Sequence, residues 1–553
     1  SVLRIISNRF PLVLARDSSR RGVKGAMGHT KESERRLIEG IEPSPKKEFI
    51  QENFKWHRGE YGDAGLEDCS WITAFLVRFQ FTVLTLLASV ADLLRNRGWI
   101  HTGAQQELKS QRSFASLDNH FEAMFVNNIY RIATDVVNRP LCGVPAVNMK
   151  LKDRVSNDYG WTYQYTGGTT EVINLGSYNY LGFSHENGPC ADAASLAIDK
   201  HGVSVGSTRH EIGNHSQQRE LEECIARYLG VEAAVTFPMG FGTNSMNIGS
   251  LVDKNSLILS DALNHASLCL GSRMSGAKVK VFKHNDPKNC EKQLRQALCQ
   301  PNPNTGKPYN KILIIVEGIY SMEGTIVNLP EFIRIKKKYG AYLFLDEAHS
   351  VGALGPTGKG VVEYWGCDPR DVDIMMGTLT KSFAGAGGYI GGAERTIRHI
   401  RATCVGACYG TVMSPPVIAQ VRSAMRIMQG EDGTRIGITK AEQLLRNTRY
   451  FRARLKQMGF IIYGHMDSPV VPLMSFYITK VVCFGRETLK HGVGIVSVAF
   501  PATPLTKARA RFCISADHTK EQLDKVLEVC SEVGDVTGTK FGTIDPNPAP
   551  VFY

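Results

Sequence analysis

The sequence predicts an α/β fold, with a mostly parallel sheet in a large domain followed by a smaller α+β domain. Three observations lead to this prediction. From about residue 171, short β-branched runs alternate with longer amphipathic runs, which is typical of strands joined by helical crossovers. A long apolar segment stands apart from this pattern, nearer the N-terminal end. With 553 residues, the chain is also too long for one compact core.

The strands and helices can be placed by their patterning. Buried strands are predicted at 231–237, 256–259, 278–282, 312–316, 342–345 and 374–376, with helices between them at 218–229 and 330–339. The C-terminal domain is predicted from a helix at 440–458, strands at 460–463 and 470–473, and a helix at 520–533. We expect these divisions: a basic segment 1–65, a membrane-associated helix 66–100, an arm or linker 101–170, a large domain 171–430, a small domain 431–540 and a loose tail 541–553.

The basic residues gather at the start of the sequence. The formal net charge is +12, and Asp17 is the single acid before Glu32. Such a segment can attract nucleic acid, anionic lipid or an import receptor. No nucleic-acid-binding motif accompanies it, so we expect no nucleic-acid partner. The opening is also similar to a mitochondrial transit peptide, and that alternative stays open.

The cysteines point to neither metal nor disulfide chemistry. The sequence holds 13 cysteines, scattered through apolar segments without a CxxC pair. Zinc sites and disulfide frameworks need regular spacing. We therefore expect no metal, and thiols that are reduced as in the cytosol.

The longest apolar segment runs from Trp71 to Ala91. Its length matches the roughly 20 residues that cross a bilayer. Arg78 and Gln80 interrupt it, and a charge near a helix centre is costly in lipid. The segment can span the membrane, lie in its interface, or pack on the protein body. Membrane association is the favoured interpretation, with spanning and lying flat both open.

Lys381 lies in an apolar, glycine-rich stretch that runs from Gly377 to Gly392. Burial lowers the pKa of a lysine and makes its neutral, nucleophilic amine available. Such an amine suits covalent attachment to the aldehyde of pyridoxal phosphate (PLP). A buried lysine paired with a carboxylate beside a tight turn is an equally good interpretation of this stretch alone.

Polar side chains follow several predicted strands. Asp346 and His349 follow the strand at 342–345, and His265 follows the strand at 256–259. Ligands of open α/β sheets bind at the carboxyl ends of strands. There an aspartate can hold a protonated pyridine nitrogen, and a histidine can stack on a planar cofactor. The alternatives are a helix-capping role for Asp346 and a surface position for His265.

Two further features suit anionic groups. The turn from Pro238 to Ser245 can present backbone amides to a phosphate. Arg511 alternates into a predicted strand, where its guanidinium can bind a carboxylate, although a surface ion pair is the more common role. The run from Gly355 to Gly360 lacks the Walker spacing. An ATPase or a dehydrogenase is therefore not predicted.

An ordered set of motifs resembles the α-oxoamine synthase family of PLP-dependent enzymes. These motifs are SYNYLG (177–182), GFGTNS (240–245), DALNHASL (261–268), EGIYSMEG (317–324), LDEAHSVGALGPTGKG (345–360), GTLTKSF (377–383) and PATP with RARF within 501–512. Within that family, the sequence is most similar to the lysine-bearing catalytic subunits of the serine palmitoyltransferases, over most of 117–535. The resemblance implies an aspartate-aminotransferase-type fold.

The resemblance also implies roles for individual residues. Lys381 would bind the PLP aldehyde, Asp346 the pyridine nitrogen, and His265 would stack on the ring. His349 and Ser321 would contact the phenolic oxygen, and Thr378 would line the site. Gly240, Phe241 and Thr380 would hold the phosphate. Arg511 would bind the serine carboxylate, with Tyr178 near the substrate.

The implied activity is a decarboxylative condensation of L-serine with palmitoyl-CoA that gives 3-ketosphinganine, the first step of sphingolipid biosynthesis. The implied partners are a lysine-free subunit 1, which would complete active sites at a heterodimer interface, and small membrane regulators. The implied location is the endoplasmic reticulum membrane, with the catalytic domain facing the cytosol.

Two alternatives remain. A 5-aminolevulinate synthase would use glycine and succinyl-CoA, and the transit-like opening favours it slightly. A catalytically inactive regulatory subunit would lack the lysine. The presence of Lys381, with Asp346 and His265, argues against that alternative. One departure from the family is the run Ala384-Gly385-Ala386, where relatives usually carry glycine after the lysine motif.

Overall fold

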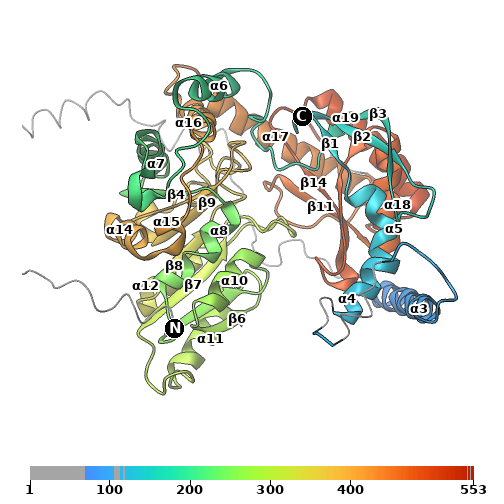
Figure 1. Cartoon of the computed structure of the whole chain (residues 1–553), viewed down its shortest axis with the longest axis horizontal. Helices are drawn as coiled ribbons and strands as arrows, with labels where there is room; N and C mark the ends of the chain where they lie inside the picture. Colours follow the sequence, from blue (N-terminus) through green and yellow to red (C-terminus); the bar gives the residue numbers. More distant parts are fainter. Residues whose placement is uncertain (1–68, 105–112, 116–118, 545, 548–549) are drawn as a thin grey trace, which may run out of the picture. The chain divides into compact units, whose positions relative to one another are not determined.

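The computed structural model describes residues 69–104, 113–115, 119–544, 546–547 and 550–553 (Figure 1). The predicted basic segment 1–65 and its transit-like opening lie outside the described residues. The predicted alternation of strands and helices from 171 onward is confirmed, so the chain has the α/β fold that its patterning indicates.

The large domain is built on a seven-stranded sheet with the order β4-β10-β9-β8-β7-β5-β6. Its strands are β4 (Ala233–Phe237), β5 (Ser256–Asp261), β6 (Lys278–Phe282), β7 (Lys311–Glu317), β8 (Tyr342–Asp346), β9 (Ile374–Thr378) and β10 (Gly388–Gly392). β6, β5, β7, β8 and β9 pair in parallel, while β10 is antiparallel to both of its neighbours. Each strand predicted from the sequence in this domain is therefore confirmed.

Helices connect these strands and cover both faces of the sheet (Figure 1). They are α6 (Pro189–His201), η3 (Arg209–Gly213), α7 (Ser216–Leu229), α8 (Gly240–Ser245), α9 (Ile248–Leu251), α10 (Ala266–Met274), α11 (Pro287–Leu298), α12 (Leu329–Tyr339), α13 (Val361–Trp365), η4 (Pro369–Asp371), α14 (Glu394–Thr403), α15 (Val405–Cys408) and α16 (Pro415–Gln429). Several end at a glycine with a left-handed backbone, such as Gly230 (φ 73°) after α7 and Gly340 (φ 63°) after α12. Glycine adopts this conformation without the steric penalty of a Cβ atom.

Strand β7 shows how the sheet divides the core. Ile314 and Val316 join one buried cluster with Phe332 of α12. Leu313 and Ile315, which alternate with them, join another cluster with Ile397 of α14. Side chains of a strand point alternately to its two faces. A strand buried on both faces therefore reads as a continuous apolar run, and this is why β7 could be recognised in the sequence.

The C-terminal domain contains a three-stranded sheet with the order β11-β14-β13. Its elements are α17 (Ile436–Gln457), β11 (Val470–Phe476), α18 (Ile478–Lys490), β12 (Val493–Gly494), β13 (Val496–Val498), η5 (Leu505–Lys507), β14 (Ala508–Cys513) and α19 (Lys520–Thr537). The prediction of a strand at 460–463 is wrong, because only Ile462 forms an isolated bridge, to Leu473. Gly459 and Gly464 bracket this segment with left-handed backbones, which limits its pairing with β11 to the hydrogen bonds around Ile462.

A further sheet joins the middle of the chain to the C-terminal domain. β1 (Leu141–Cys142), β2 (Asn148–Val155) and β3 (Gln164–Asn174) are antiparallel, and β12 pairs in parallel with β3. Before them lie α4 (His120–Phe125), η2 (Val126–Tyr130) and α5 (Arg131–Val137). The predicted boundary at residues 170 and 171 falls inside β3, and the domain divisions stay a prediction.

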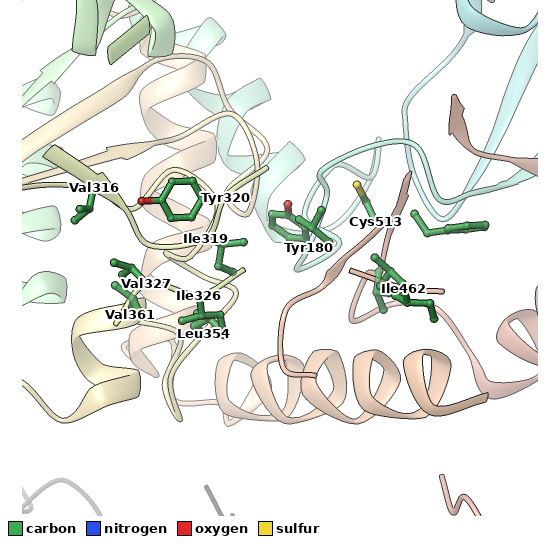
Figure 2. Close-up of a cluster of buried hydrophobic side chains, with 14 of the residues drawn as sticks. Tyr180, Val316, Ile319, Tyr320, Ile326, Val327, Leu354, Val361, Ile462 and Cys513 are labelled. Atoms are coloured by element: carbon green, nitrogen blue, oxygen red, sulfur yellow. The ribbon is translucent and has the colours of Figure 1, made fainter. Parts of the chain in front are cut away.

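One buried cluster connects the large and C-terminal domains (Figure 2). It includes Val316 and Tyr320 from the large domain and Ile462 and Cys513 from the C-terminal domain. Tyr180, which is fully buried, lies between these groups in Figure 2. The continuity of this cluster fixes β14 against the end of β7, where the polar residues gather.

Helix α3 (Trp71–Asn96) is the predicted apolar segment. One side packs on the C-terminal domain: Val77 joins Met474 in a small cluster, and Gln80 Nε2 donates to Thr479 Oγ1 over 2.7 Å. The opposite side exposes large apolar residues, namely Ile72, Phe75, Leu76, Phe79, Val83, Leu86, Leu87, Val90 and Leu93. α3 is long and apolar enough to cross a membrane, although length and composition alone are weak evidence. Its exposed apolar side fits membrane association.

Candidate active site

The predicted site residues converge at one edge of the large sheet. Glu317, Asp346 and Thr378 end β7, β8 and β9, which are neighbours in the sheet. Lys381 follows three residues after β9, and Arg511 lies on β14 of the C-terminal domain. Because these strands are parallel, their carboxyl ends meet at one edge, and ligands bind there in open α/β sheets.

The Lys381 amine is held in enclosed surroundings. Its Nζ lies 5.5 Å from the centre of the Tyr178 ring. Desolvation by burial lowers the pKa of Lys381 from 10.5 to about 8, although Asp346 and Glu317 act in the opposite direction. Among the described residues no ion pair involves Lys381, so the alternative of a lysine paired directly with a carboxylate is not supported. A much larger share of neutral, nucleophilic amine is present at neutral pH than in an exposed lysine.

Asp346 is a buried hydrogen-bond acceptor. Its Oδ2 accepts from Asn244 Nδ2 at 2.7 Å, and its Oδ1 accepts from the Ala348 backbone N–H at 2.8 Å. The residues after Asp346 form turns rather than a helix. The alternative of a helix cap is therefore wrong, because no helix begins there. The two donors fix the orientation of the carboxyl group, which lies where it can accept a hydrogen bond from a pyridine nitrogen.

His265 caps helix α10, and its ring is exposed toward the site. Its Nδ1 accepts from the Ser267 backbone N–H at 3.3 Å and lies 2.8 Å from Ser267 Oγ. Desolvation by burial lowers the pKa of His265. The ring of Phe241 lies 6.0 Å away, edge to face. His265 is thus a neutral imidazole with a fixed Nδ1 acceptor and an exposed face on which a planar ring can stack.

His349 and two tyrosines form a buried aromatic group near Lys381. His349 Nδ1 lies 2.9 Å from Tyr180 Oη, and the ring of Tyr178 lies 4.8 Å from the His349 ring. Burial holds the pKa of His349 well below its usual value, with the Lys381 charge acting in the same direction. His349 is therefore neutral and can share a hydrogen bond with a phenolic oxygen. Ser321, its predicted companion, lies in the turn that the Ile319–Ile326 bridge closes.

The predicted phosphate site is a close approach of three segments. Gly240 begins α8, and a Cβ atom there would lie 2.8 Å from Thr378 Oγ1. Thr378 Oγ1 lies 2.7 Å from Thr380 Oγ1 and donates to Gly387 O at 3.1 Å. The structure therefore brings Gly240, Thr378 and Thr380 together, with Phe241 at the same helix start. Backbone amides at a helix start and adjacent hydroxyls can bind an anion.

Arg511 points toward the same aromatic group. Its guanidinium carbon lies 4.6 Å from the centre of the Tyr178 ring, and its Nη1 contacts Met322 Sδ at 3.6 Å. Its Nε is buried without a hydrogen-bond partner. No ion pair of Arg511 occurs in the described part of the chain, so the alternative of a surface ion pair does not hold. An enclosed guanidinium with unused donors suits a substrate carboxylate.

Several residues of this arrangement were not predicted. Asn244 and Ser267 support Asp346 and His265, Glu317 accepts from the His265 backbone N–H, and Tyr180 bonds His349. Most become visible only when distant segments fold together. Glu317 could have been found, since it ends a predicted strand just as Asp346 does.

These residues fit PLP on evidence from the site itself. The fit rests on a depressed lysine pKa, a supported carboxylate, a neutral histidine and a cradle that only glycine fits at residue 240. Bound PLP acts as an electron sink for bonds at the substrate α-carbon. Among the described residues, no group of three or more His, Cys, Asp or Glu side chains is placed to hold a metal ion.

The comparisons with known proteins agree with this geometry. Residues 170–529 match the family model "Aminotransferase class I and II". "Serine palmitoyltransferase 3" of Caenorhabditis elegans is 61% identical over 469 residues, which cover 85% of this chain and 92% of that protein. "Serine palmitoyltransferase 3" of Homo sapiens is 48% identical over 470 residues, with 85% of each chain covered. The solved structure "Sphingomonas wittichii Serine palmitoyltransferase" has a TM-score of 0.67 at 26% identity and covers 77% of this chain and 99% of that one.

Fold, site and comparisons together define a PLP-dependent enzyme of the class I and II aminotransferase fold. Within that class, the chain belongs to the serine palmitoyltransferase family, whose members are acyltransferases. The predicted fold class, cofactor and family are confirmed. Relatives named "Serine palmitoyltransferase 2" and "Serine palmitoyltransferase 3" both match, at 51% and 61% identity, so the choice between types 2 and 3 is left open.

Proposed function

We propose that this chain is the catalytic, lysine-bearing subunit of a serine palmitoyltransferase, of the type numbered 2. It condenses L-serine with palmitoyl-CoA and releases CoA and carbon dioxide, which gives 3-ketosphinganine and begins sphingolipid synthesis. The observation that carries this proposal is the half-buried Lys381 amine, with its lowered pKa, among Asp346, His265 and Arg511 at one sheet edge. Membership of the serine palmitoyltransferase family supports the choice of substrates.

The site residues would have different roles in binding PLP. Lys381 would hold the PLP aldehyde, and its amine, with a pKa lowered to about 8, would take up and return a proton at the substrate α-carbon. Asp346 would accept from the protonated pyridine nitrogen, and His265 would stack on one face of the ring. His349 and Ser321 would contact the phenolic oxygen. Gly240, Phe241 and Thr380 would hold the phosphate, with Thr378 lining the site.

Arg511 and Tyr178 orient the amino-acid substrate. Arg511 offers a fork of donors to the serine carboxylate, and Tyr178 lies 4.6 Å from its guanidinium. The same tyrosine ring lies 5.5 Å from Lys381 Nζ. The Tyr178 ring therefore lies near both the guanidinium that would bind the carboxylate and the Lys381 amine.

The chain acts with a lysine-free subunit 1, and the two complete active sites at a shared interface. Exposed apolar residues beside the phosphate cradle support this proposal: Met239, Phe241, Met246, Val405 and Tyr409. Apolar side chains that gather on a surface are typical of protein interfaces. Small membrane subunits can join the same assembly.

We place the enzyme at the endoplasmic reticulum membrane with its catalytic domain in the cytosol, and α3 flat in the membrane interface. α3 contacts the protein body at Val77 and again near its other end, where Arg95 Nη2 donates to Asn128 Oδ1 at 2.8 Å. These contacts along the helix support the flat orientation over a crossing one. Arg78, Thr82, Thr85 and Ser89 form a polar edge between the body and the apolar side, which suits headgroups.

A substrate panel tests the activity. The chain is co-expressed with a subunit 1 partner and offered serine, glycine or alanine with palmitoyl-CoA or succinyl-CoA. Serine with palmitoyl-CoA should give the highest turnover. Faster product formation from glycine and succinyl-CoA would instead establish a 5-aminolevulinate synthase. No product from any pair, together with no bound PLP, would indicate a regulatory subunit.

A further inference from the structure

At the sheet edge, hydrogen bonds and the peptide link between Glu317 and Gly318 join five side chains and the Gly318 backbone into a closed ring. The Glu317 carboxyl accepts from the His265 backbone N–H, and His265 Nδ1 lies 2.8 Å from Ser267 Oγ. Asn244 Nδ2 donates to Ser267 Oγ at 3.0 Å and to Asp346 Oδ2 at 2.7 Å. The Gly318 backbone N–H, directly after Glu317, donates to Asp346 O at 2.8 Å and closes the ring.

The donor and acceptor of each hydrogen bond can be assigned, starting from the N–H groups of Asn244. Both N–H groups of the Asn244 amide are used, one toward Ser267 and one toward Asp346. The Ser267 hydroxyl accepts from Asn244 and so donates to His265 Nδ1, which also accepts from the Ser267 backbone N–H. His265 therefore carries its proton on Nε2. It is the exposed member of the ring, while the other four side chains are buried.

The ring contains two carboxyl groups that compete for ionisation. Glu317 and Asp346 are register partners on adjacent parallel strands, so their side chains share one face of the sheet. Two like charges this close, both out of water, cannot both ionise cheaply. Asp346 receives two donors on its carboxyl group, whereas Glu317 receives one backbone N–H.

We propose that Glu317 is a neutral carboxylic acid that positions His265 through the hydrogen bond it accepts from the His265 backbone N–H. Glu317 Oε1 accepts from the His265 N–H, so the proton lies on Oε2. Burial is the leading influence on the ionisation of Glu317. The titratable groups that face it are Asp346 on β8, Asp261 on β5, Lys381 after β9, Tyr320 after β7, and His265 and Cys269 at α10. Glu317 thereby fixes the start of α10 without adding a negative charge beside Asp346. The inference rests on the proposed role of His265.

The apoprotein offers a test that needs no activity. A carboxyl whose folded pKa lies above its unfolded value keeps its proton in the native state while the unfolded chain loses it. Its contribution to stability therefore falls as pH rises above about 4.5. Replacing Glu317 by Gln removes this loss. The difference in melting temperature, full-length Glu317→Gln minus wild type, should become more positive from pH 5 to pH 8.

Glu222 supplies the matched control. Its buried carboxylate lies 2.9 Å from Arg209 Nη1 and 2.7 Å from Arg401 Nη2. Glu222→Gln should destabilise the protein across the same pH range, because it breaks ion pairs. A Glu317→Gln curve that follows the Glu222→Gln curve, or that shows no such increase, would overturn the neutral form of Glu317.

The positioning role is tested in the holoenzyme with its partner. Glu317→Gln keeps a neutral acceptor for the His265 N–H, so it should keep the PLP absorbance spectrum, its pH profile and the KM for serine. Glu317→Asp and Glu317→Ala lose the bond, and each should raise that KM about tenfold and shift the spectrum, as expected for one lost buried hydrogen bond. Equal damage from Gln and Ala would overturn the proposal. If wild type binds PLP but makes no 3-ketosphinganine, the proposed function fails, while spectra and melting curves still decide this inference.

Discussion

The active site and helix α3 differ in what they keep from water. At the site, charged groups such as Lys381 and Asp346 are enclosed among the ends of β8 and β9. Along α3, large apolar residues such as Phe79 and Leu86 remain in solvent, with 60% and 63% of their surface exposed. Buried charge and exposed apolar surface each raise the free energy of an isolated chain.

This difference indicates that each region needs a binding partner that matches it: a polar ligand for the site and an apolar one for α3. An anionic aromatic cofactor fits the enclosed polar site, and a lipid surface fits the exposed apolar side of α3. The two regions are also separate in sequence, and the apolar side chains of α3 that face away from the body are exposed. A change in one should therefore leave the function of the other intact.

The largest expected effect comes from removing the Lys381 amine. Lys381→Ala should lower turnover of serine and palmitoyl-CoA by about a thousandfold or more, since no other described lysine approaches Tyr178 in this way. Membrane association of the protein should not change. Lys338, an exposed lysine that bonds Glu291, is the control, and Lys338→Ala should keep full activity. Full activity in Lys381→Ala would refute the site assignment.

The reverse experiment changes α3 alone. Replacing Phe79, Leu86 and Leu87 together by Ser removes three exposed apolar side chains, each of which contributes about 1.5–3 kcal/mol when buried. Partition into liposomes should fall by about a hundredfold or more, as measured by flotation. Turnover in detergent should stay near wild type. A control that changes the polar edge, Thr82→Ser, should float as wild type does, and a triple variant that still floats would disprove the lipid contact.

Two arginines on β14 sharpen the comparison within the site. Arg509 Nη1 pairs with Glu323 at 3.2 Å and donates to Met322 O at 2.6 Å, whereas Arg511 has no ion pair among the described residues. Arg511→Lys should raise the KM for serine about tenfold with little change in melting temperature, because it loses a two-pronged contact. Arg509→Lys should mainly lower the melting temperature. If Arg509→Lys raised the KM and Arg511→Lys lowered the melting temperature, then Arg509 would be the substrate-binding residue and Arg511 the structural one.

The smallest expected effect concerns the altered run after Lys381. Ala384 has a left-handed backbone, with φ of 50°. A Cβ atom is disfavoured there, so Ala384→Gly should stabilise the protein by about 0.5–1 kcal/mol in denaturant unfolding. Gly387→Ala is the opposing control, since a Cβ there would lie 2.3 Å from Phe237 O and should destabilise. A loss of stability in Ala384→Gly would contradict this explanation.

Much of the fold could be predicted because burial on both faces makes a strand visible. β7 and β8 read as continuous apolar runs, and β14 as an alternating one. The strand predicted at 460–463 was wrong because its flanking glycines matter more than its β-branched residues. The orientation of α3 could not be predicted, because its composition does not show which side of the helix packs on the C-terminal domain near Thr479.

The site was predictable where one rule applied, namely that polar residues at strand ends bind ligands. This rule identified Asp346 and His265, whereas Lys381 was identified from the apolar, glycine-rich stretch around it. Their supports depend on long-range contacts: Asn244 meets Asp346 across 102 residues of sequence, and Glu317 meets His265 across 52. No local pattern encodes such pairings, and the sequence-based roles of individual residues stay predictions until they are tested.

The most direct test of the site is to trap PLP on the protein and map where it is attached. The full-length chain with its partner is treated with borohydride, digested and examined by peptide mass spectrometry. We expect a phosphopyridoxyl group on the peptide that contains Lys381, and its loss in Lys381→Ala. Label on a different lysine, or none on wild type that contains PLP, would contradict the account.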